Sequence, residues 1–236
     1  MPKVYINKKE KIMKKLLIVA VSTALLASSL PASAQMGMLK KAKSLTSSSD
    51  AGMGDLTSQQ TGIVNRLVSG MTNMTSGQAQ VARALGLKDQ ADLLESERDA
   101  LSSGNVKDKD GIKRSMKVSE DAQEAINTKM AEETVIDAEA KKEFGKALPF
   151  YAKGTADTIR LLPELKKWAS SASSTMKGAG IRELPKLKKT LGTGLFVAKN
   201  LPKYAKKSQT SYKALSDFSK KNEIDTSEAD DMLGDL

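Results

Sequence analysis

Three groups of side chains have types and spacings that could support binding or catalysis, and the first follows part of the calcium-loop pattern. Asp108, Asp110 and Gly111 fit the third, fifth and sixth positions of that loop. Val106 and Lys117 fall on its first and twelfth positions, where carboxylates are required. The pattern therefore favours a capped polar loop over a calcium site.

The second group consists of four closely spaced acids, Glu132, Glu133, Asp137 and Glu139. A pair of carboxylates can hydrolyse a glycosidic bond when one acts as an acid and the other as a base or nucleophile. Sugar clefts usually also contain aromatic side chains, and none lies among these acids. A solvated helix face is the preferred interpretation, and a carboxylate-only hydrolase is kept as an alternative function.

The third group is the lysine-rich segment 177–221. It contains twelve Lys and Arg residues and only two acids, which gives a net charge of +10. Helices over 181–191 and 203–221 are expected to pack as a hairpin with their apolar stripes inward. Such a hairpin would turn one set of lysines outward: Lys186, Lys189, Lys203, Lys206 and Lys207. Lysines on amphipathic helices suit anionic lipid, lipopolysaccharide or another polyanion. The alternative is that they only keep a helix face solvated.

The chain contains no histidine and no cysteine, and this excludes several classes of enzyme. A Ser-His-Asp triad, a cysteine nucleophile and an imidazole base are all impossible. The usual zinc sites and His- or Cys-ligated haem and iron–sulfur clusters are excluded in the same way. No phosphate-binding or dinucleotide-binding glycine motif is present. We therefore expect a protein that is not an enzyme and has no cofactor.

The first 34 residues have the layout of a secretory signal peptide. A basic cluster, Lys8–Lys15, precedes a largely apolar run of 15 residues, Leu16–Leu30, and an Ala-Ser-Ala sequence ends at Ala34. The true start could be Met13, and cleavage would leave Gln35 first. We expect a protein exported to a bacterial periplasm, or secreted, and not transmembrane after cleavage. Export also argues against nucleic acid as a partner.

The rest of the chain is expected to be all-α, because apolar residues recur every three or four positions and strand signals are nearly absent. Residues 35–54 are predicted to form a flexible lead, 55–222 a helical domain and 223–236 an acidic tail of net charge −6. The domain should be an elongated or kinked bundle of about five or six helices. One helix should begin at Asp55 and end before Gly86, and another should cover 88–102.

Four Leu-Pro pairs punctuate the second half of the domain. Two apolar stripes follow one another, over 112–130 and over 136–176, and a straight helix from 112 to 176 would be nearly 100 Å long at ~1.5 Å per residue. Pro149 and Pro163 interrupt the second stripe and are predicted to kink its helix. Pro185 and Pro202 follow local helix breakers, so they are predicted to start new helices.

These features favour a non-catalytic helical protein with a binding or scaffolding role in the bacterial envelope. Its lysine-rich segment would contact an anionic lipid or lipopolysaccharide surface. A helical adaptor or immunity-type protein that binds another envelope protein is the alternative from a different class. That alternative would be marked by an exposed apolar groove beside the lysine face.

Overall fold

The computed structural model describes residues 36–132 and 135–234. The chain divides into two compact units, Met1–Lys43 and Ser44–Leu236. The predicted signal peptide lies outside the described residues. The described part of the first unit is the beginning of one helix, and the second unit holds the remaining described residues.

The described residues form eight helices and no strand, which confirms the all-α prediction. The bundle has more helices than the five or six expected, because the 112–176 stretch is divided among α3, α4 and α5 and the predicted acidic tail contains a further helix, α8. The helices are α1 (Met36–Ala84), α2 (Lys88–Ser102), α3 (Lys109–Glu132), α4 (Ala138–Arg160), α5 (Leu162–Gly178), α6 (Leu184–Thr190), α7 (Gly192–Lys221) and α8 (Ser227–Gly234).

Helix α1 begins at Met36, so residues 36–54 are helical where a flexible lead was predicted. Glycine and serine lower helix propensity in this stretch by at most ~1 kcal/mol each, and no proline interrupts it. The few large apolar side chains gave no clear period there, and that is why the helix was missed. Asp55 is consequently an interior residue of α1 and not its N-cap.

The other end of α1 lies where the sequence predicted it. Gly86 has φ of +75°, a left-handed conformation that glycine adopts without steric cost. The Leu87 N–H donates to the Ala82 carbonyl at 2.8 Å, which closes the helix end. Helix α2 starts at the next residue, Lys88, so the chain reverses within three residues.

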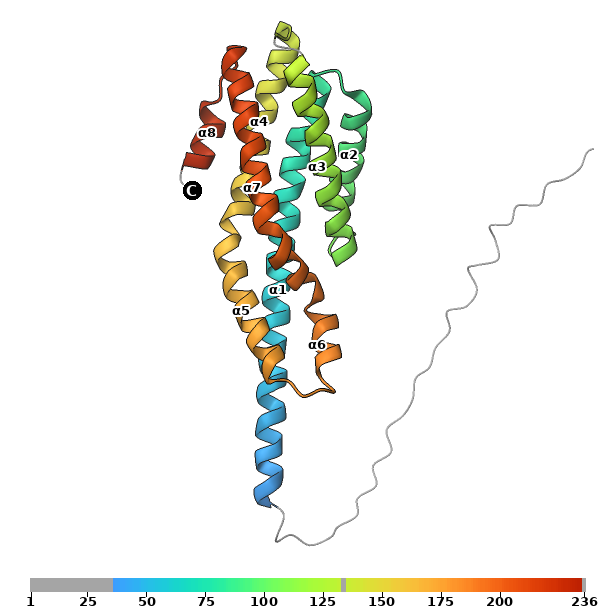
Figure 1. Cartoon of the computed structure of the whole chain (residues 1–236), viewed down its shortest axis with the longest axis vertical. Helices are drawn as coiled ribbons and strands as arrows, with labels where there is room; N and C mark the ends of the chain where they lie inside the picture. Colours follow the sequence, from blue (N-terminus) through green and yellow to red (C-terminus); the bar gives the residue numbers. More distant parts are fainter. Residues whose placement is uncertain (1–35, 133–134, 235–236) are drawn as a thin grey trace, which may run out of the picture. The chain divides into compact units, whose positions relative to one another are not determined.

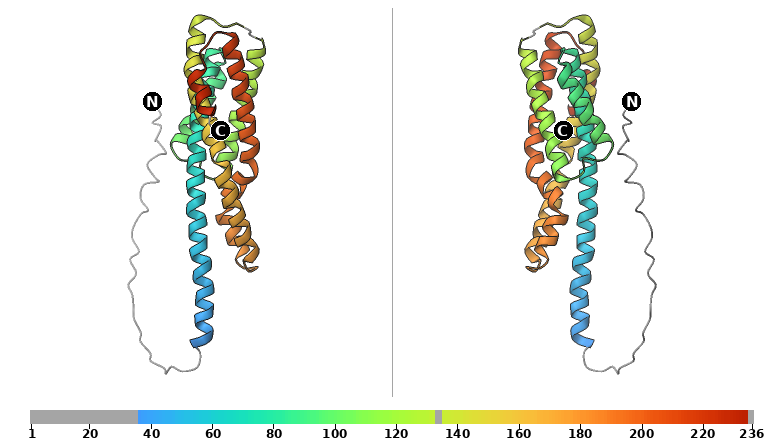
Figure 2. Two further views of the ribbon diagram at one scale, coloured as in Figure 1. Left: turned by 90° about the vertical axis from the view of Figure 1, so that its left-hand side faces the viewer. Right: turned by 90° about the vertical axis from the view of Figure 1, so that its right-hand side faces the viewer.

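Within the second unit, successive runs of helix alternate in direction (Figure 1). Helix α3 runs opposite to α2, α4 and α5 continue one another, and α6 and α7 return beside them. Figure 2 shows the same helices from two further sides. Helix α6 contacts both α5 and α7. Helix α7 packs against α3, α4 and α5, so it forms one wall of the bundle.

The core is built mainly from α1, α4 and α7, and α3 and α5 add further buried side chains. Its largest fully buried side chains include Trp168, Tyr151, Phe144, Ile63, Leu67 and Met71. The Trp168 Nε1–H donates to the Leu56 carbonyl at 2.9 Å, which satisfies the indole inside the core and ties α5 to α1. The rings of Phe144 and Phe218, 5.3 Å apart, join α4 to α7.

The four prolines occupy two kinds of position. Pro149 lies inside α4, and Pro163 lies in the first turn of α5, where only Leu161 separates the two helices. Pro185 lies in the first turn of α6. Pro202 lies inside α7, ten residues after its start, so the prediction that it begins a helix is wrong.

The misassignment of Pro202 came from treating Asn200 as a helix breaker. In the structure the Asn200 side chain donates to the Phe196 carbonyl one turn earlier, at 2.8 Å, within the helix. Pro202 is exposed and has no backbone N–H, so one carbonyl of the preceding turn loses its helical hydrogen bond. This loss occurs on the solvent side of α7. The helix therefore continues through both residues.

A side chain from α1, that of Gln60, bridges the break between α6 and α7. The Gln60 Nε2–H donates to the Thr190 carbonyl at 3.1 Å, and the Gly194 N–H donates to Gln60 Oε1 at 2.9 Å. The amide thus satisfies one backbone group on each side of the break. Gly192 already belongs to α7, so no separate turn follows.

The acidic end of the chain is packed and is not a free tail. Ile224 and Ala229 are buried, and α8 lies against α4. The Asp230 carboxylate accepts hydrogen bonds from the hydroxyls of Tyr212, at 2.7 Å, and Thr226, at 2.8 Å. Its ion pair with Lys220 spans 3.2 Å. The segment therefore contributes to the helical domain.

Candidate functional site

The structure brings together three of the five predicted surface lysines. Lys203, Lys206 and Lys207 are exposed on α7 and line the same pocket. Lys207 contacts the Glu120 carboxylate of α3 at 2.5 Å, so its charge is partly neutralised. Lys203 and Lys206 have no ion pair among the described residues, so they leave two uncompensated cations at this pocket.

Lys186 and Lys189 are also exposed, but they lie on α6, which does not form the predicted hairpin with α7. Only Leu191 separates the two helices, and the Leu195 N–H donates back to its carbonyl at 3.0 Å. A reversal between helices needs a connection of at least about two residues. The hairpin prediction is therefore wrong, because α7 begins eleven residues earlier than the sequence suggested.

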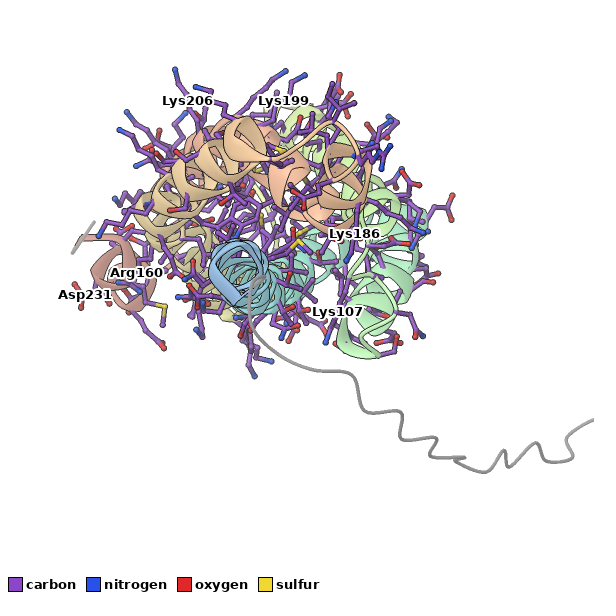
Figure 3. All side chains as sticks on the ribbon, turned by 90° about the horizontal axis from the view of Figure 1, so that it is seen from below. Lys107, Arg160, Lys186, Lys199, Lys206 and Asp231 are labelled. Carbon is purple, nitrogen blue, oxygen red and sulfur yellow. The ribbon has the colours of Figure 1, made fainter. Side chains whose placement is uncertain are left out.

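Figure 3 shows that Lys186 lies apart from Lys199 and Lys206, which both point outward from α7. The five lysines consequently do not form one face. Lys199 was not predicted as a site residue because the helix was thought to start after it.

With α7 running from Gly192, four exposed lysines follow one another at helical spacing. We name Lys199, Lys203, Lys206 and Lys213 the lysine stripe. Steps of four, three and seven residues keep all four within about 80° of the helix circumference. None of the four forms an ion pair within the part of the chain that the structure describes. The stripe extends over about 21 Å at ~1.5 Å per residue.

The pocket beside the stripe has a volume of about 490 Å³ and opens between α3 and α7. Buried side chains from four helices form its floor. They are Met74 and Gln78 of α1, Ser119 and Gln123 of α3, Tyr151 of α4, and Tyr204 and Ser208 of α7. All but Met74 are polar, which is unusual so deep in a helical bundle.

The polar groups of the floor hydrogen-bond to one another. Gln78 Nε2 donates to the Ser119 carbonyl at 2.9 Å and to Gln123 Oε1 at 3.1 Å, and Ser119 Oγ donates to Gln78 Oε1 at 2.8 Å. The hydroxyl of Tyr151 donates to Gln123 Oε1 at 2.9 Å. The hydroxyl of Tyr204 donates to Ser119 Oγ at 3.1 Å. A network that is satisfied in this way fixes the relative positions of its helices.

Both tyrosines of the floor are held in their neutral form. Burial raises the pKa of Tyr204 to about 12, against the opposing effect of its hydrogen bond with Ser119. Burial also raises the pKa of Tyr151, and the nearby Tyr204 adds to the rise. Neither tyrosine is therefore suited to act as a base near neutral pH.

The acidic groups singled out in the sequence occupy structural positions. Asp137 is the N-cap of α4 and accepts from the Ala140 N–H at 2.8 Å, while Glu132 and Glu139 are exposed. Glu133 lies outside the described residues. Asp108 caps the first turn of α3 by accepting from the Gly111 N–H at 2.6 Å. Within residues 36–132 and 135–234, no three potential metal ligands cluster.

A buried carboxylate on α2, that of Glu97, was not expected from the sequence. Ser115 donates to the Glu97 carboxylate, and Arg114 lies 3.8 Å from it, so α2 is tied to α3. Two structural partners already occupy this carboxylate, and it does not face the pocket between α3 and α7.

A second groove of about 920 Å³ lies between α4 and α8. Pro149 and Phe150 contribute apolar surface, and Phe150 is 46% exposed. Its lysines come from α4 and its acids from the 223–228 region, so it is not beside the lysine stripe. The mixture of charges gives no preference for one kind of partner.

Comparison with known proteins identified no relative of this chain. None of the helices within the described ranges is both long and apolar enough to cross a membrane. No family model matches the chain, and no curated protein or solved structure shows significant similarity to it.

Proposed function

We propose that the protein is an exported, non-catalytic component of the bacterial envelope that binds an anionic surface through the lysine stripe of α7. The observation that carries the proposal is the stripe itself: Lys199, Lys203, Lys206 and Lys213 are exposed, aligned and without an ion pair within the described residues. Anionic lipid head groups or lipopolysaccharide would supply the opposite charge.

The charge of the surrounding segment supports this proposal. Helices α6 and α7 carry ten lysines, and Asp217 is the single acid within them. Acidic side chains from α3 and α8 pair with Lys207 and Lys220, so these neighbours compensate only two of the ten. A surface that served only to stay solvated would need no such separation of charge.

The test is binding of the full mature chain to vesicles of phosphatidylglycerol and of phosphatidylcholine. We expect binding to the anionic vesicles at low salt and release as the ionic strength approaches 0.15 M, where the screening length is ~8 Å. Each lysine near an anionic membrane contributes about 1 kcal/mol. The double variant Lys199→Ala/Lys213→Ala should therefore bind roughly 30-fold more weakly.

The matched control is Lys88→Ala/Lys107→Ala, which removes the same charge from exposed positions outside α7. Figure 3 places Lys107 on the side opposite Lys199 and Lys206. This control should retain nearly the full affinity. Equal binding to neutral and anionic vesicles, or equal losses in the two double variants, would refute a specific role for the stripe.

A further inference from the structure

The pocket between α3 and α7 differs sharply between its floor and its rim. The polar groups of the floor already hydrogen-bond to one another, as described above. The floor therefore determines the shape of the pocket and leaves few polar groups free to bind a ligand. The rim groups are exposed or half-buried, and within the described residues Glu124, Lys203 and Lys206 have no side-chain hydrogen bond or ion pair. The charged and amide groups of the rim are Glu120, Glu124 and Asn127 on α3, and Lys203, Lys206 and Lys207 on α7.

The charges of the rim nearly balance. Three lysines face two glutamates, which leaves a net charge of +1, and the contact between Lys207 and Glu120 removes one charge of each sign. Lys203 and Lys206 then remain beside Glu124. A ligand with several negative charges would be repelled by the glutamates, and a cation would be repelled by the lysines. A single negative charge is what the rim can accommodate.

The remaining rim groups favour a ligand with hydroxyls. Glu124 can only accept hydrogen bonds, and the two lysines can only donate them. Asn127 Oδ1 already accepts from Gln123 at 2.9 Å, while its own amide N–H groups donate no bond within the described residues. A hydroxyl both donates and accepts, so neighbouring hydroxyls of one molecule would satisfy this mixture. The volume of 490 Å³ falls within the range of small-molecule sites.

We propose that this pocket binds a monoanionic sugar: a hydroxylated ring with one carboxylate or phosphodiester. The anionic group would lie between Lys203 and Lys206, and ring hydroxyls would lie against Glu124 and Asn127. The inference deepens the proposed function and rests on it, because it names the head-group chemistry that the middle of the lysine stripe would recognise. The sugar could be free or the head of a glycolipid, since the recognised group is the same.

The first experiment titrates the full mature chain, followed by amide NMR shifts, with glucuronate, glucose and inorganic phosphate. We expect saturable shifts at the rim with glucuronate and binding at least tenfold weaker for the other two probes. Glucose lacks the charge, and phosphate lacks the hydroxylated ring. Equal affinity for glucuronate and glucose, or for glucuronate and phosphate, would overturn the proposal, and so would an absence of shifts with glucuronate.

Two sets of variants test the pocket. Lys203→Ala/Lys206→Ala should weaken glucuronate binding by roughly 10- to 100-fold, the range for a lost hydrogen bond to a charged group. Asn127→Ala should weaken it by a smaller factor. The control Lys88→Ala/Lys107→Ala removes the same charge outside both the stripe and the pocket lining, and it should leave glucuronate affinity unchanged. All these side chains are exposed, so the unfolding midpoint should hardly change and a folding defect would be recognised.

Vesicles then separate the source of the sugar from the general attraction of the stripe. If a glycolipid is the ligand, free glucuronate should displace the chain from lipopolysaccharide but not from phosphatidylglycerol vesicles. If the ligand is a free sugar, glucuronate should displace the chain neither from lipopolysaccharide nor from phosphatidylglycerol vesicles. Binding to anionic vesicles without any glucuronate binding would overturn this inference and leave the proposed function standing. Glucuronate binding without any vesicle binding would overturn the proposed function and leave the assignment of the pocket to a sugar standing.

Discussion

Helix α1 borders two very different interfaces between Gly70 and Gln78, a stretch of about two turns. On the α4 side, the backbones nearly touch: a Cβ added to Gly154 would lie 2.5 Å from both the Gly70 carbonyl oxygen and the Met74 nitrogen. On the α3 and α7 side, Met74 and Gln78 border a pocket of about 490 Å³. The same stretch of helix is therefore tightly packed on one side and faces an open, polar pocket on the other.

The difference shows how the packed interface positions the open one. A Cβ added to Gly77 would lie 2.7 Å from the Tyr151 nitrogen, so α1 and α4 have little freedom to slide at this level. This contact holds Tyr151 where its hydroxyl reaches Gln123 on α3. The small residues between α1 and α4 thus act as the support for the polar floor, and the space for a ligand lies only on the other side.

The largest effect should come from filling the packed interface. Gly154→Val places methyl groups where the Gly70 and Met74 backbones lie, and neither can move without shifting a helix. We expect the free energy of unfolding to fall by about 3 kcal/mol or more, the upper range for overpacking. Urea unfolding followed by circular dichroism measures this change.

The matched control is Gly62→Ala on α1, where an added Cβ meets nothing within 4 Å. Alanine has the better helix propensity, so this variant should be more stable by about 0.5–1 kcal/mol. If Gly154→Val unfolded at the same urea concentration as the wild type, the tight contact between α1 and α4 would not exist in solution.

A smaller effect should follow from removing the floor of the open side. Gln78→Ala deletes hydrogen bonds to the Ser119 carbonyl and to Gln123, and one from the Ser119 hydroxyl. Leaving buried partners unsatisfied costs about 1–3 kcal/mol, and the adjacent pocket admits water, so we expect a loss of about 2 kcal/mol. Gln59→Ala changes an exposed amide of the same helix and should cost no more than ~0.5 kcal/mol. Similar losses in the two variants would argue that the network does not hold the pocket together.

The sequence predicted the helices well where large apolar residues recur and poorly where small residues determine the packing. Helix α2 has the predicted bounds, 88–102. In contrast, Gly154 was counted as part of no interface, because a glycine adds nothing to a hydrophobic period. Its role depends on which helix faces it, and this is a tertiary property.

The candidate site was only partly predictable for the same reason. The lysines of α7 were identified from charge alone, but the helix start was misplaced, so Lys199 was missed and Lys186 and Lys189 were included. Lys213 was left out although it lies inside the predicted helix 203–221. A stripe with steps of four, three and seven residues was already present in the sequence. The polar floor was not predictable, because Gln78, Ser119 and Tyr204 are separated by at least 41 residues in the chain.

The smallest effect should come from removing one hydroxyl in the floor of the pocket, that of Tyr204. Tyr204→Phe removes the hydrogen bond to Ser119 Oγ, which keeps its own bond to Gln78, so no buried partner is left unsatisfied. We expect a loss of about 1 kcal/mol at pH 7. Because Phe cannot ionise, comparing this variant with the wild type also isolates the titration of Tyr204.

The sign of the pH dependence follows from burial, which raises the pKa of Tyr204 from its usual value of ~10 to about 12. The folded state then holds the proton more tightly than the unfolded state. The stability contributed by Tyr204 is fully present below pH ~10 and is lost as the pH rises through about 12. By pH 11 the loss should be roughly 1.4 kcal/mol, so the variant and the wild type should become about equally stable there. Urea unfolding at pH 7, 9, 10 and 11 tests this, and a difference that stayed constant over this range would mean that the Tyr204 hydroxyl is not buried beneath the pocket.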